Sequence, residues 1–567
     1  MKSEGIKFET IFPFVAWFRH YSGKDLASDM FAGLTVVVVL IPQVMAFASL
    51  AGLPPVYGLY ASLAGTAAAA LWGSSRHLST GPAALISFLI LTTLIPFAKP
   101  ESPKYITLAI ILTLMIGVIQ ILMGLFRLGF LMNFVSHSVI GGFTTAAAII
   151  IAATQVPSLL GFGIEKHDFV VQNLYEIVTS LGRTHLYSAA IGLIGVSLII
   201  FSKKKISKYF PAQLVVMVLG IALSFAFDFE GNGFKVLGKI DAELSPPSIP
   251  YVSFSEVVTL IPNAIIIAVI GFLQTFAISA SISKKTKQKT EVNQELIGQG
   301  IGNLASGLFK GFTISGSFAR TAVNLGAGAV SGMSSVFASL FVLLTILVFT
   351  KYLYFLPTTL LAAIVIAALV DLIEFGKFRE TYNLSGSDGI VITVTFLFAF
   401  LTKPDTAIFV GMATSLILFL RKTVSVQIPE LHFDFDEESF DLVALPNVHR
   451  DFPEILIIRI DMSVYFGNVH GIRERIFHMV EERGPELKHL VISFGGVNYF
   501  DVSACDVFNE MFDELNKKGI KIYTMYRKHQ VENIMRASGI EEKTLRIRDI
   551  KGFKAQFIIQ RNPGYLV

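Results

Sequence analysis

Two segments, one in each half of the chain, place small hydroxyl residues and a glycine immediately before a short apolar stretch. Residues 76–83 read RHLSTGPA, and the apolar stretch that follows has about 15 residues, which is short for a full membrane crossing. Residues 312–320 read FTISGSFAR and open a second short helix rich in small residues. Superposing Gly81 on Gly316 aligns the two segments. The pattern predicts one interrupted helix in each half, as in secondary transporters built from inverted repeats.

The starts of two such helices, facing each other, form a binding site of a particular kind. Each leaves free backbone N–H groups and about half a positive charge, which suits an anion that has lost part of its water. Arg320 lies near the start of the second short helix. A guanidinium within the membrane costs at least about 3 kcal/mol unless it has a partner or a function. We therefore expect Arg320 to neutralise a bound anion.

Structural explanations exist for the same residues. The glycines and Pro82 could simply break or pack helices, and Arg320 could reach the interface or form a structural ion pair. The same superposition pairs Gln43, after Leu-Ile-Pro, with Gln274, after Phe-Leu, and both glutamines could serve as polar contacts between helices. Phe47 and Phe318 could be ordinary core or lipid-facing residues.

The composition places these segments in a membrane. The chain has 567 residues, of which 53% are hydrophobic and 16% charged, and its mean hydropathy is +0.63, which is too apolar for a soluble protein of this length. We count about 14 helical segments between Asp29 and about Leu420. Clear candidate spans are Ala32–Ala51, Tyr105–Leu125, Leu186–Phe201 and Leu340–Leu356.

Basic clusters give the orientation. The positive-inside rule assigns three clusters to the cytoplasm: residues 203–205 with Lys208, residues 284–289, and Arg421 with Lys422. We therefore expect a protein of the cell membrane with both termini on the cytoplasmic side. The longer loops 161–184 and 228–255 then lie outside. Residues 11–21 read as an uncleaved interfacial segment.

The polar tail reads as a small soluble α/β domain, which the orientation places in the cytoplasm. We expect three strands, at Ile455–Ile460, Leu490–Phe494 and Ile520–Tyr526. We also expect three helices, at Gly471–Glu482, Ser503–Lys518 and His529–Ser538. The predicted domains are an N-terminal segment, a transmembrane domain and the soluble domain, at residues 1–28, 29–422 and 423–567.

Several functional classes are disfavoured. Cys505 is the single cysteine, so neither a disulfide nor a Cys-rich zinc or iron–sulfur site can form within the chain. The net charge of +4 is spread thinly and gives no basic domain for nucleic acid. We find no metal cluster, carboxylate pair or catalytic triad, and we expect no enzyme activity and no cofactor. The G-x-G-x-G run at 298–302 lacks the preceding strand of a nucleotide site.

Several motifs are specific enough to indicate a family. They are Ala32–Thr35 with Leu40–Gln43, Ala51–Tyr60, Gly73–Ser79, Asn293–Leu296 and Gly316–Asn324. With these motifs the chain resembles the sulfate permease family of anion transporters. The tail resembles the STAS domain that follows these transporters, so the resemblance spans nearly the whole chain.

The resemblance implies an α-helical membrane protein of two inverted seven-helix repeats, with core and gate domains, half-helices as segments 3 and 10, and a cytoplasmic α/β STAS domain. It also implies a homodimer and an elevator-like movement of the core. By position, the residues that would bind the anion are Gln43, Phe47, Ala83, Ser317, Phe318, Ala319 and Arg320. Gly81 of the first interrupted segment and Gln274, which the superposition pairs with Gln43, complete the predicted site.

Two positions affect regulation and coupling. Many members of the family have an acidic residue in the eighth helix where this chain has Gln274, and a neutral amide cannot titrate. We therefore leave uniport, exchange and coupling through another residue open; Asp388 is too near its helix end to substitute. Ser503 occupies the position that takes a phosphate in related STAS domains, although a helix N-cap is the simpler role.

The sequence thus predicts a transporter of small inorganic anions, with sulfate and bicarbonate ahead of chloride and small dicarboxylates. A membrane-anchored STAS signalling protein that senses anions, and a nucleobase carrier of the same fold, are the alternatives. The expected partners are the anion, the lipid bilayer, a second copy of the chain and a cytoplasmic protein that binds the STAS domain.

Overall fold

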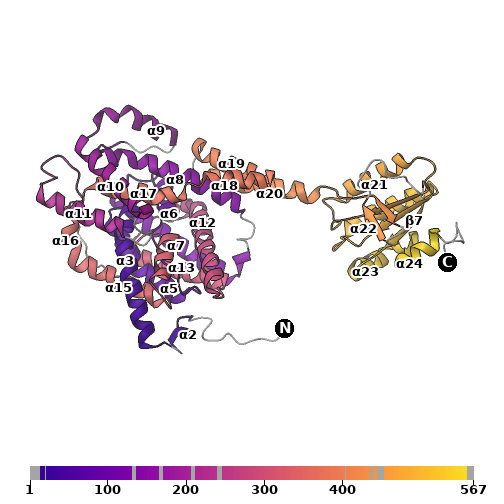
Figure 1. The fold of residues 1–567 in the computed structure, drawn as a ribbon, viewed down its shortest axis with the longest axis horizontal. Helices are drawn as coiled ribbons and strands as arrows, with labels where there is room; N and C mark the ends of the chain where they lie inside the picture. Colours follow the sequence, from indigo (N-terminus) through magenta and orange to yellow (C-terminus); the bar gives the residue numbers. More distant parts are fainter. Residues whose placement is uncertain are drawn as a thin grey trace. The chain divides into compact units, whose positions relative to one another are not determined.

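The computed structural model describes most of the chain, with gaps of 1 to 12 residues. The described ranges are residues 13–18, 21–130, 136–164, 170–205, 211–238, 246–402, 404–434, 439–442 and 453–558. Lys208 and parts of the predicted segment 11–21 and of the loops 161–184 and 228–255 lie outside them. The chain forms two compact units, residues 1–415 and 416–567, which are described separately (Figure 1).

The first unit is helical, and its two halves follow the same order of elements. After the short α2 (Val15–Phe18), the first half contains α3 (Gly23–Leu50), α4 (Val56–Tyr60), η1 (Ala61–Gly65), α5 (Thr66–Trp72), β1 (Thr80–Gly81), α6 (Ala84–Leu94), α7 (Pro103–Leu125), α8 (His137–Leu160), α9 (Val170–Thr179), η3 (Leu181–Arg183), α10 (Leu186–Lys205) and α11 (Ala212–Ala226). The second half contains α12 (Phe254–Thr286), α13 (Val292–Leu308), β2 (Ser315–Gly316), α14 (Phe318–Gly326), α15 (Met333–Leu344), η4 (Thr345–Phe349), α16 (Thr350–Leu353), α17 (Thr358–Leu369), η5 (Val370–Leu372), α18 (Phe375–Leu384), α19 (Gly386–Leu401) and α20 (Pro404–Val424).

The membrane segments differ in length and polarity. Among the described residues, 6 helices are long and apolar enough to cross a bilayer, and 6 further apolar helices are shorter. The helices α13 and α14 are more polar. Their polar side chains, including Glu295, Asn303 and Arg320, are buried inside the unit. The predicted α-helical membrane fold followed by an α/β domain is therefore confirmed.

The first helix of each half begins in the same way. Ser22 and Asp25 form a capping box at the start of α3, and Ser253 and Glu256 form one at the start of α12. Each box satisfies backbone N–H groups that the helix start leaves without acceptors. The halves therefore share their entry geometry, as the predicted internal repeat requires.

Close backbone packing positions the polar helix α13 against α7. A Cβ atom built on Gly117 would lie 2.9 Å from the carbonyl oxygen of Gly300, and one built on Gly300 would lie 2.7 Å from that of Gly117. Such contacts between small residues let helices approach without side chains between them. They fix α13 rigidly beside the segment that carries β2.

The second unit is an α/β domain. Its parallel sheet has the order β5 (Ile455–Arg459), β6 (His489–Ser493), β7 (Lys521–Met525) and β8 (Leu545–Ile547). Buried residues of α21 (Val469–Arg483), α22 (Val502–Lys517) and α23 (His529–Ala537) pack on one face of it. The hairpin strand β3 (Leu431–Asp434), which pairs with β4 (Ser439–Leu442), and the segment of α24 (Ile550–Phe553) and η7 (Lys554–Ile558) contribute to the other. All three predicted strands and all three predicted helices are confirmed; the short β8 was not predicted.

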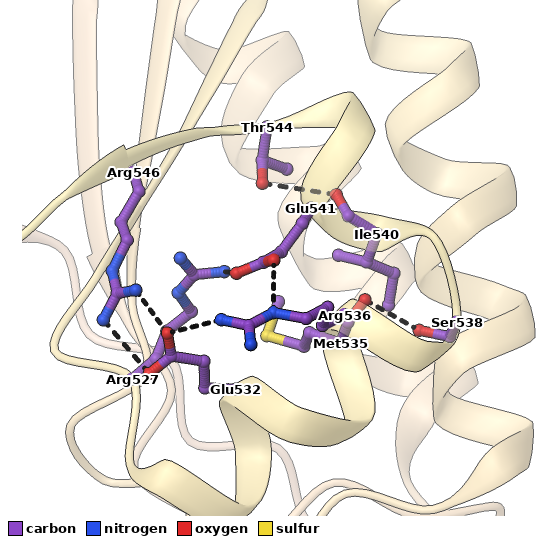
Figure 2. A network of polar contacts seen from close by, with 9 residues as sticks. All are labelled: Arg527, Glu532, Met535, Arg536, Ser538, Ile540, Glu541, Thr544 and Arg546. Carbon is purple, nitrogen blue, oxygen red and sulfur yellow. Dashed lines mark hydrogen bonds and ion pairs between the residues drawn. The ribbon is translucent and has the colours of Figure 1, made fainter.

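A network of ion pairs lies on the soluble unit (Figure 2). Glu541, in η6 (Ile540–Lys543), lies 3.0 Å from Arg527 Nη1 and 3.1 Å from Arg536 Nε, measured from its two carboxylate oxygens. Glu532 forms ion pairs with Arg536 and Arg546. Both carboxylates, those of Glu541 and Glu532, therefore have arginine partners, and the ion pairs connect α23, η6 and β8.

Candidate anion site between two half-helices

The two interrupted segments meet and pair as a two-residue antiparallel ladder. Thr80 of β1 lies opposite Gly316 of β2, and Gly81 lies opposite Ser315. If Gly81 corresponds to Gly316, then Thr80 corresponds to Ser315, and each pair maps onto the other under a two-fold rotation. The sequence superposition therefore matches the register of the ladder.

Side chains from neighbouring helices hold this ladder in place. On the β1 side, the Thr66 hydroxyl donates to the Thr80 carbonyl at 2.9 Å, and Gln299 Nε2 donates to the Thr80 hydroxyl at 3.1 Å. On the β2 side, the Gly316 N–H donates to the Thr275 hydroxyl at 2.9 Å. These polar groups are satisfied within the unit, so the ladder is a rigid support and not an exposed loop.

A short helix follows each strand and begins beside the ladder. The cap residue of α6, Ala83, is extended, and its side chain provides no acceptor for the first N–H groups of α6. The cap residue of α14, Ser317, is also extended, and its hydroxyl accepts from the Arg320 N–H at 3.4 Å. Both segments therefore switch from extended to helical conformation as predicted.

Arg320, the third residue of α14, is fully buried between these helix starts. Its Nη1 donates to the Pro82 carbonyl at 3.0 Å and reaches Gln43 Oε1 at 3.5 Å. Its Nε and Nη2 atoms have no hydrogen-bond partner in the part of the chain that the structure describes. A Cβ atom on Gly81 would lie only 3.2 Å from Nη2, so a glycine leaves room for the guanidinium.

The two glutamines occupy related but different positions. Gln43 is buried in α3, where its Oε1 accepts from Arg320 and its Nε2 donates to Gln213 Oε1 at 2.9 Å. Gln274 of α12 donates to the Gly316 carbonyl at 3.2 Å, and its Oε1 has no partner among the described residues. Both glutamines thus bond to residues of the second interrupted segment, Gln43 to Arg320 and Gln274 to Gly316.

The remaining predicted residues differ in exposure. Phe47 and Ala83 are buried in the apolar core of the unit, whereas Phe318 is 54% exposed and Ala319 is also exposed. The structure therefore brings Gln43, Gly81 and Arg320 into contact and leaves the start of α14 accessible.

Some residues that build this region were not predicted. Gln213, Gln299 and Thr275 each bond to a site residue or to the ladder. Their sequence signal is a polar residue inside an otherwise apolar or small-residue helix, which marks functional positions in membranes. That signal does not reveal which segment such a residue will face.

Ser503, in the second unit, does not cap the helix that it was expected to cap. The cap of α22 is Asp501, whose carboxylate accepts from the Ala504 N–H at 2.8 Å and from the Phe466 N–H at 2.9 Å. Ser503 is exposed in the first turn and is not the cap, so the N-cap prediction was wrong. The cause is that Asp501, two residues earlier, can also bond across to the segment that carries Phe466.

Two further features of the described ranges bear on the site. No group of three or more His, Cys, Asp or Glu side chains there could hold a metal ion. A cavity of about 420 Å³ lies between α3, α6, α8 and α17, and none of the predicted site residues lines it. The cavity and the helix starts are therefore separate features.

Comparisons with known proteins agree with this arrangement. Residues 26–395 match the model of the sulfate permease family, and residues 448–551 match the STAS domain. The chain is similar to sulfate transporter 4.1 of Arabidopsis thaliana chloroplasts, with 29% identity over 94% of this chain and 80% of that protein. It is also similar to the putative sulfate transporter YvdB of Bacillus subtilis, with 28% identity over 93% of this chain and 96% of the other.

Solved structures show the same fold. Murine Solute Carrier 26 family member A9, an anion transporter in the inward-facing state, superposes with a TM-score of 0.90 at 23% identity, covering 99% of this chain and 96% of that one. The transmembrane domain of the cyanobacterium bicarbonate transporter BicA gives a TM-score of 0.61 at 24% identity over 70% of this chain and 98% of the other. The relatives are named as transporters and not as enzymes. This chain therefore belongs to the sulfate permease family of anion transporters and carries a STAS domain after its membrane-spanning helices.

Proposed function

We propose that this protein carries sulfate across the cytoplasmic membrane, with bicarbonate as the second candidate, by alternating access in which the helices around β1 and β2 move as a unit. The observation that carries the proposal is the buried guanidinium of Arg320, two of whose donor atoms have no partner among the residues that the structure describes. A buried cation without a carboxylate partner is costly, and a bound anion would offset that cost.

The charge at the helix starts favours a divalent anion. Arg320 contributes one positive charge, and the N-termini of α6 and α14 contribute about half a charge each. The sum is close to two positive charges. This would balance the two negative charges of sulfate and exceeds the single negative charge of bicarbonate. The named relatives include sulfate transporters, and one structural neighbour is named a bicarbonate transporter.

Each candidate residue has a proposed role. The free N–H groups at the starts of α6 and α14, near Ala83 and Ala319, donate to the anion, and Arg320 adds Nε and Nη2. Gln43 and Gln274 orient the two segments. Gly81 keeps space beside the guanidinium, Ser317 caps α14, and Phe47 and Phe318 supply apolar surface that excludes water.

Coupling follows from Gln274. The amide beside Gly316 carries no charge at any pH and cannot bind a proton or balance a cation. We propose that transport is uniport or anion exchange and does not use a proton or sodium ion at this position. Uptake that persists after the pH and sodium gradients are dissipated would support this, and uptake that requires either gradient would contradict it.

Membrane placement and assembly are part of the same proposal. Arg421 and Lys422 lie in the last turn of α20, the last membrane helix, and the positive-inside rule makes them support for a cytoplasmic C-terminal unit. We propose a homodimer in which the STAS domain binds a cytoplasmic protein, with Ser503 as its regulatory position. Deleting residues 424–567 should change rate or expression more than anion preference.

The decisive experiment is flux into proteoliposomes. Labelled sulfate, labelled bicarbonate and labelled uracil are offered separately, and unlabelled sulfate, bicarbonate, chloride and a small dicarboxylate compete. Sulfate uptake that is blocked best by sulfate supports the proposal. No flux of any anion would favour a sensor, and uracil uptake would favour a nucleobase carrier.

A further inference from the structure

Gln213 joins the candidate site from a helix that does not build it. It is the second residue of α11, and its Oε1 accepts from Gln43 Nε2 at 2.9 Å. Gln43 Oε1 in turn faces Arg320 Nη1 at 3.5 Å. The three side chains form a line from α11 through α3 to the guanidinium.

The chemistry of an amide makes this contact directional. A glutamine side chain has an acceptor at one end and a donor group at the other. Because Gln213 takes the donor end of Gln43, the carbonyl end of Gln43 is the one that faces Arg320. Rotation of the Gln43 amide by half a turn would direct its NH₂ group toward the guanidinium, where two donors would oppose each other, and would also break the hydrogen bond to Gln213.

The helix that carries Gln213 belongs to a different set of neighbours from the helices that support the ladder. α11 packs against α3, the helix that carries Gln43, and against α10 and α17. α10 and α17 also pack against each other, and α17 packs against α3 and α8. The ladder is supported by residues of α5, α12 and α13. Gln213 therefore reaches the site from a helix that does not support the ladder. Most of the α11 sequence that follows it, from Leu214 to Leu223, is apolar.

We propose that Gln213 is a positioning residue for anion binding: it fixes the orientation of the Gln43 amide and thereby the direction in which the Arg320 guanidinium presents its free donors. This inference rests on the proposed function, because it requires the anion to bind at Arg320. It assigns a role in affinity to α11, which contributes no half-helix and no backbone donor to the site.

The experiment is a double-mutant cycle in the full-length protein. Gln213→Met keeps the volume and removes the acceptor, and Gln213→Ala serves as a second variant. The matched control is Ser224→Ala on the same helix, where a buried hydroxyl without a partner among the described residues is removed far from the site. Sulfate KM and maximal flux are measured for each variant, alone and combined with Gln43→Ala.

Loss of a neutral hydrogen bond costs about 1 kcal/mol. We therefore expect Gln213→Met to raise the sulfate KM about 5-fold, with unchanged maximal flux and no effect of Ser224→Ala on KM. In the Gln43→Ala background, Gln213→Met should have no further effect. An equal effect in both backgrounds, or no effect in either, would overturn the inference.

An Arg320→Ala arm separates this inference from the proposal on which it rests. If Arg320→Ala leaves sulfate affinity unchanged, the proposed site itself is wrong. If Arg320→Ala weakens binding while the effects of Gln213 and Gln43 simply add, the site stands and only the role of Gln213 fails.

Discussion

Two buried arginines, one in each unit, have opposite surroundings. The Arg527 side chain is 2% exposed and forms an ion pair with Glu541, whose carboxylate oxygen lies 3.0 Å from Arg527 Nη1 (Figure 2). Arg320 is 0% exposed, and the described residues provide it with only the Pro82 carbonyl and the Gln43 amide. Arg527 has its counter-charge built into the fold, and Arg320 has none, which leaves it able to bind a charge from outside.

The soluble arginine shows how a structural guanidinium is accommodated. Burial and the nearby Arg546 lower the pKa of Arg527, whereas Glu541 and Glu532 raise it. Breaking a buried ion pair by removing one partner is strongly destabilising. The two arginines should therefore respond to substitution in opposite ways: one through ligand binding and the other through stability.

The largest expected effect is that of Arg320→Ala on anion binding. Hydrogen bonds to charged groups contribute about 1.5–3 kcal/mol each, so losing two of them should weaken sulfate binding by at least about 150-fold. The free energy of unfolding should not fall, because an unpaired buried charge is removed. Equilibrium binding and thermal unfolding of the purified protein measure both. Loss of folding with retained affinity would reverse the comparison.

The next effect is that of Arg527→Ala on stability. Glu541 keeps Arg536 as a partner, so we expect the soluble unit to lose about 2 kcal/mol of unfolding free energy. Sulfate affinity should stay within experimental error. Denaturant unfolding of the full-length protein, followed by a probe in the soluble unit, measures the first quantity. A 10-fold loss of sulfate affinity instead would show that the two arginines are not functionally distinct.

Gly81→Ala tests the space around Arg320 without removing its charge. The added Cβ would lie 3.2 Å from Nη2, so the guanidinium must move. Overpacking of this kind costs about 1–3 kcal/mol, and we expect sulfate affinity to fall about 10-fold. Competition binding measures the shift. An unchanged affinity would mean that Nη2 does not contact the anion.

The smallest expected effect concerns pH and the soluble network. A hydrogen bond from Arg536 lowers the pKa of Glu541, so the stabilisation from this carboxylate is present at neutral pH and disappears as pH falls through the folded-state pKa. Stability of the soluble unit should therefore decline below about pH 4.5, and Glu541→Gln should lessen that decline. Unfolding midpoints between pH 3 and pH 7 test this. An identical decline in both proteins would exclude Glu541 as a source.

The sequence was sufficient for features that depend on local patterns. The interrupted segments around Gly81 and Gly316, the position of Arg320 and the elements of the soluble unit follow from spacing, polarity and periodicity. The ladder register and the contacts of Gln213 and Gln299 depend on how distant helices pack, and no local pattern encodes that. Asp501 replaced Ser503 as the cap for the same reason, because a contact from residue 466 decided between two capable side chains.

The most direct test of the account is to locate the anion. Selenate has the charge and shape of sulfate and scatters anomalously, so a crystal of the protein soaked in selenate reveals its position. We predict an anomalous peak between the starts of α6 and α14, within hydrogen-bond distance of Arg320 Nη2. A peak confined to the cavity between α3, α6, α8 and α17, with the helix starts empty, would contradict the account.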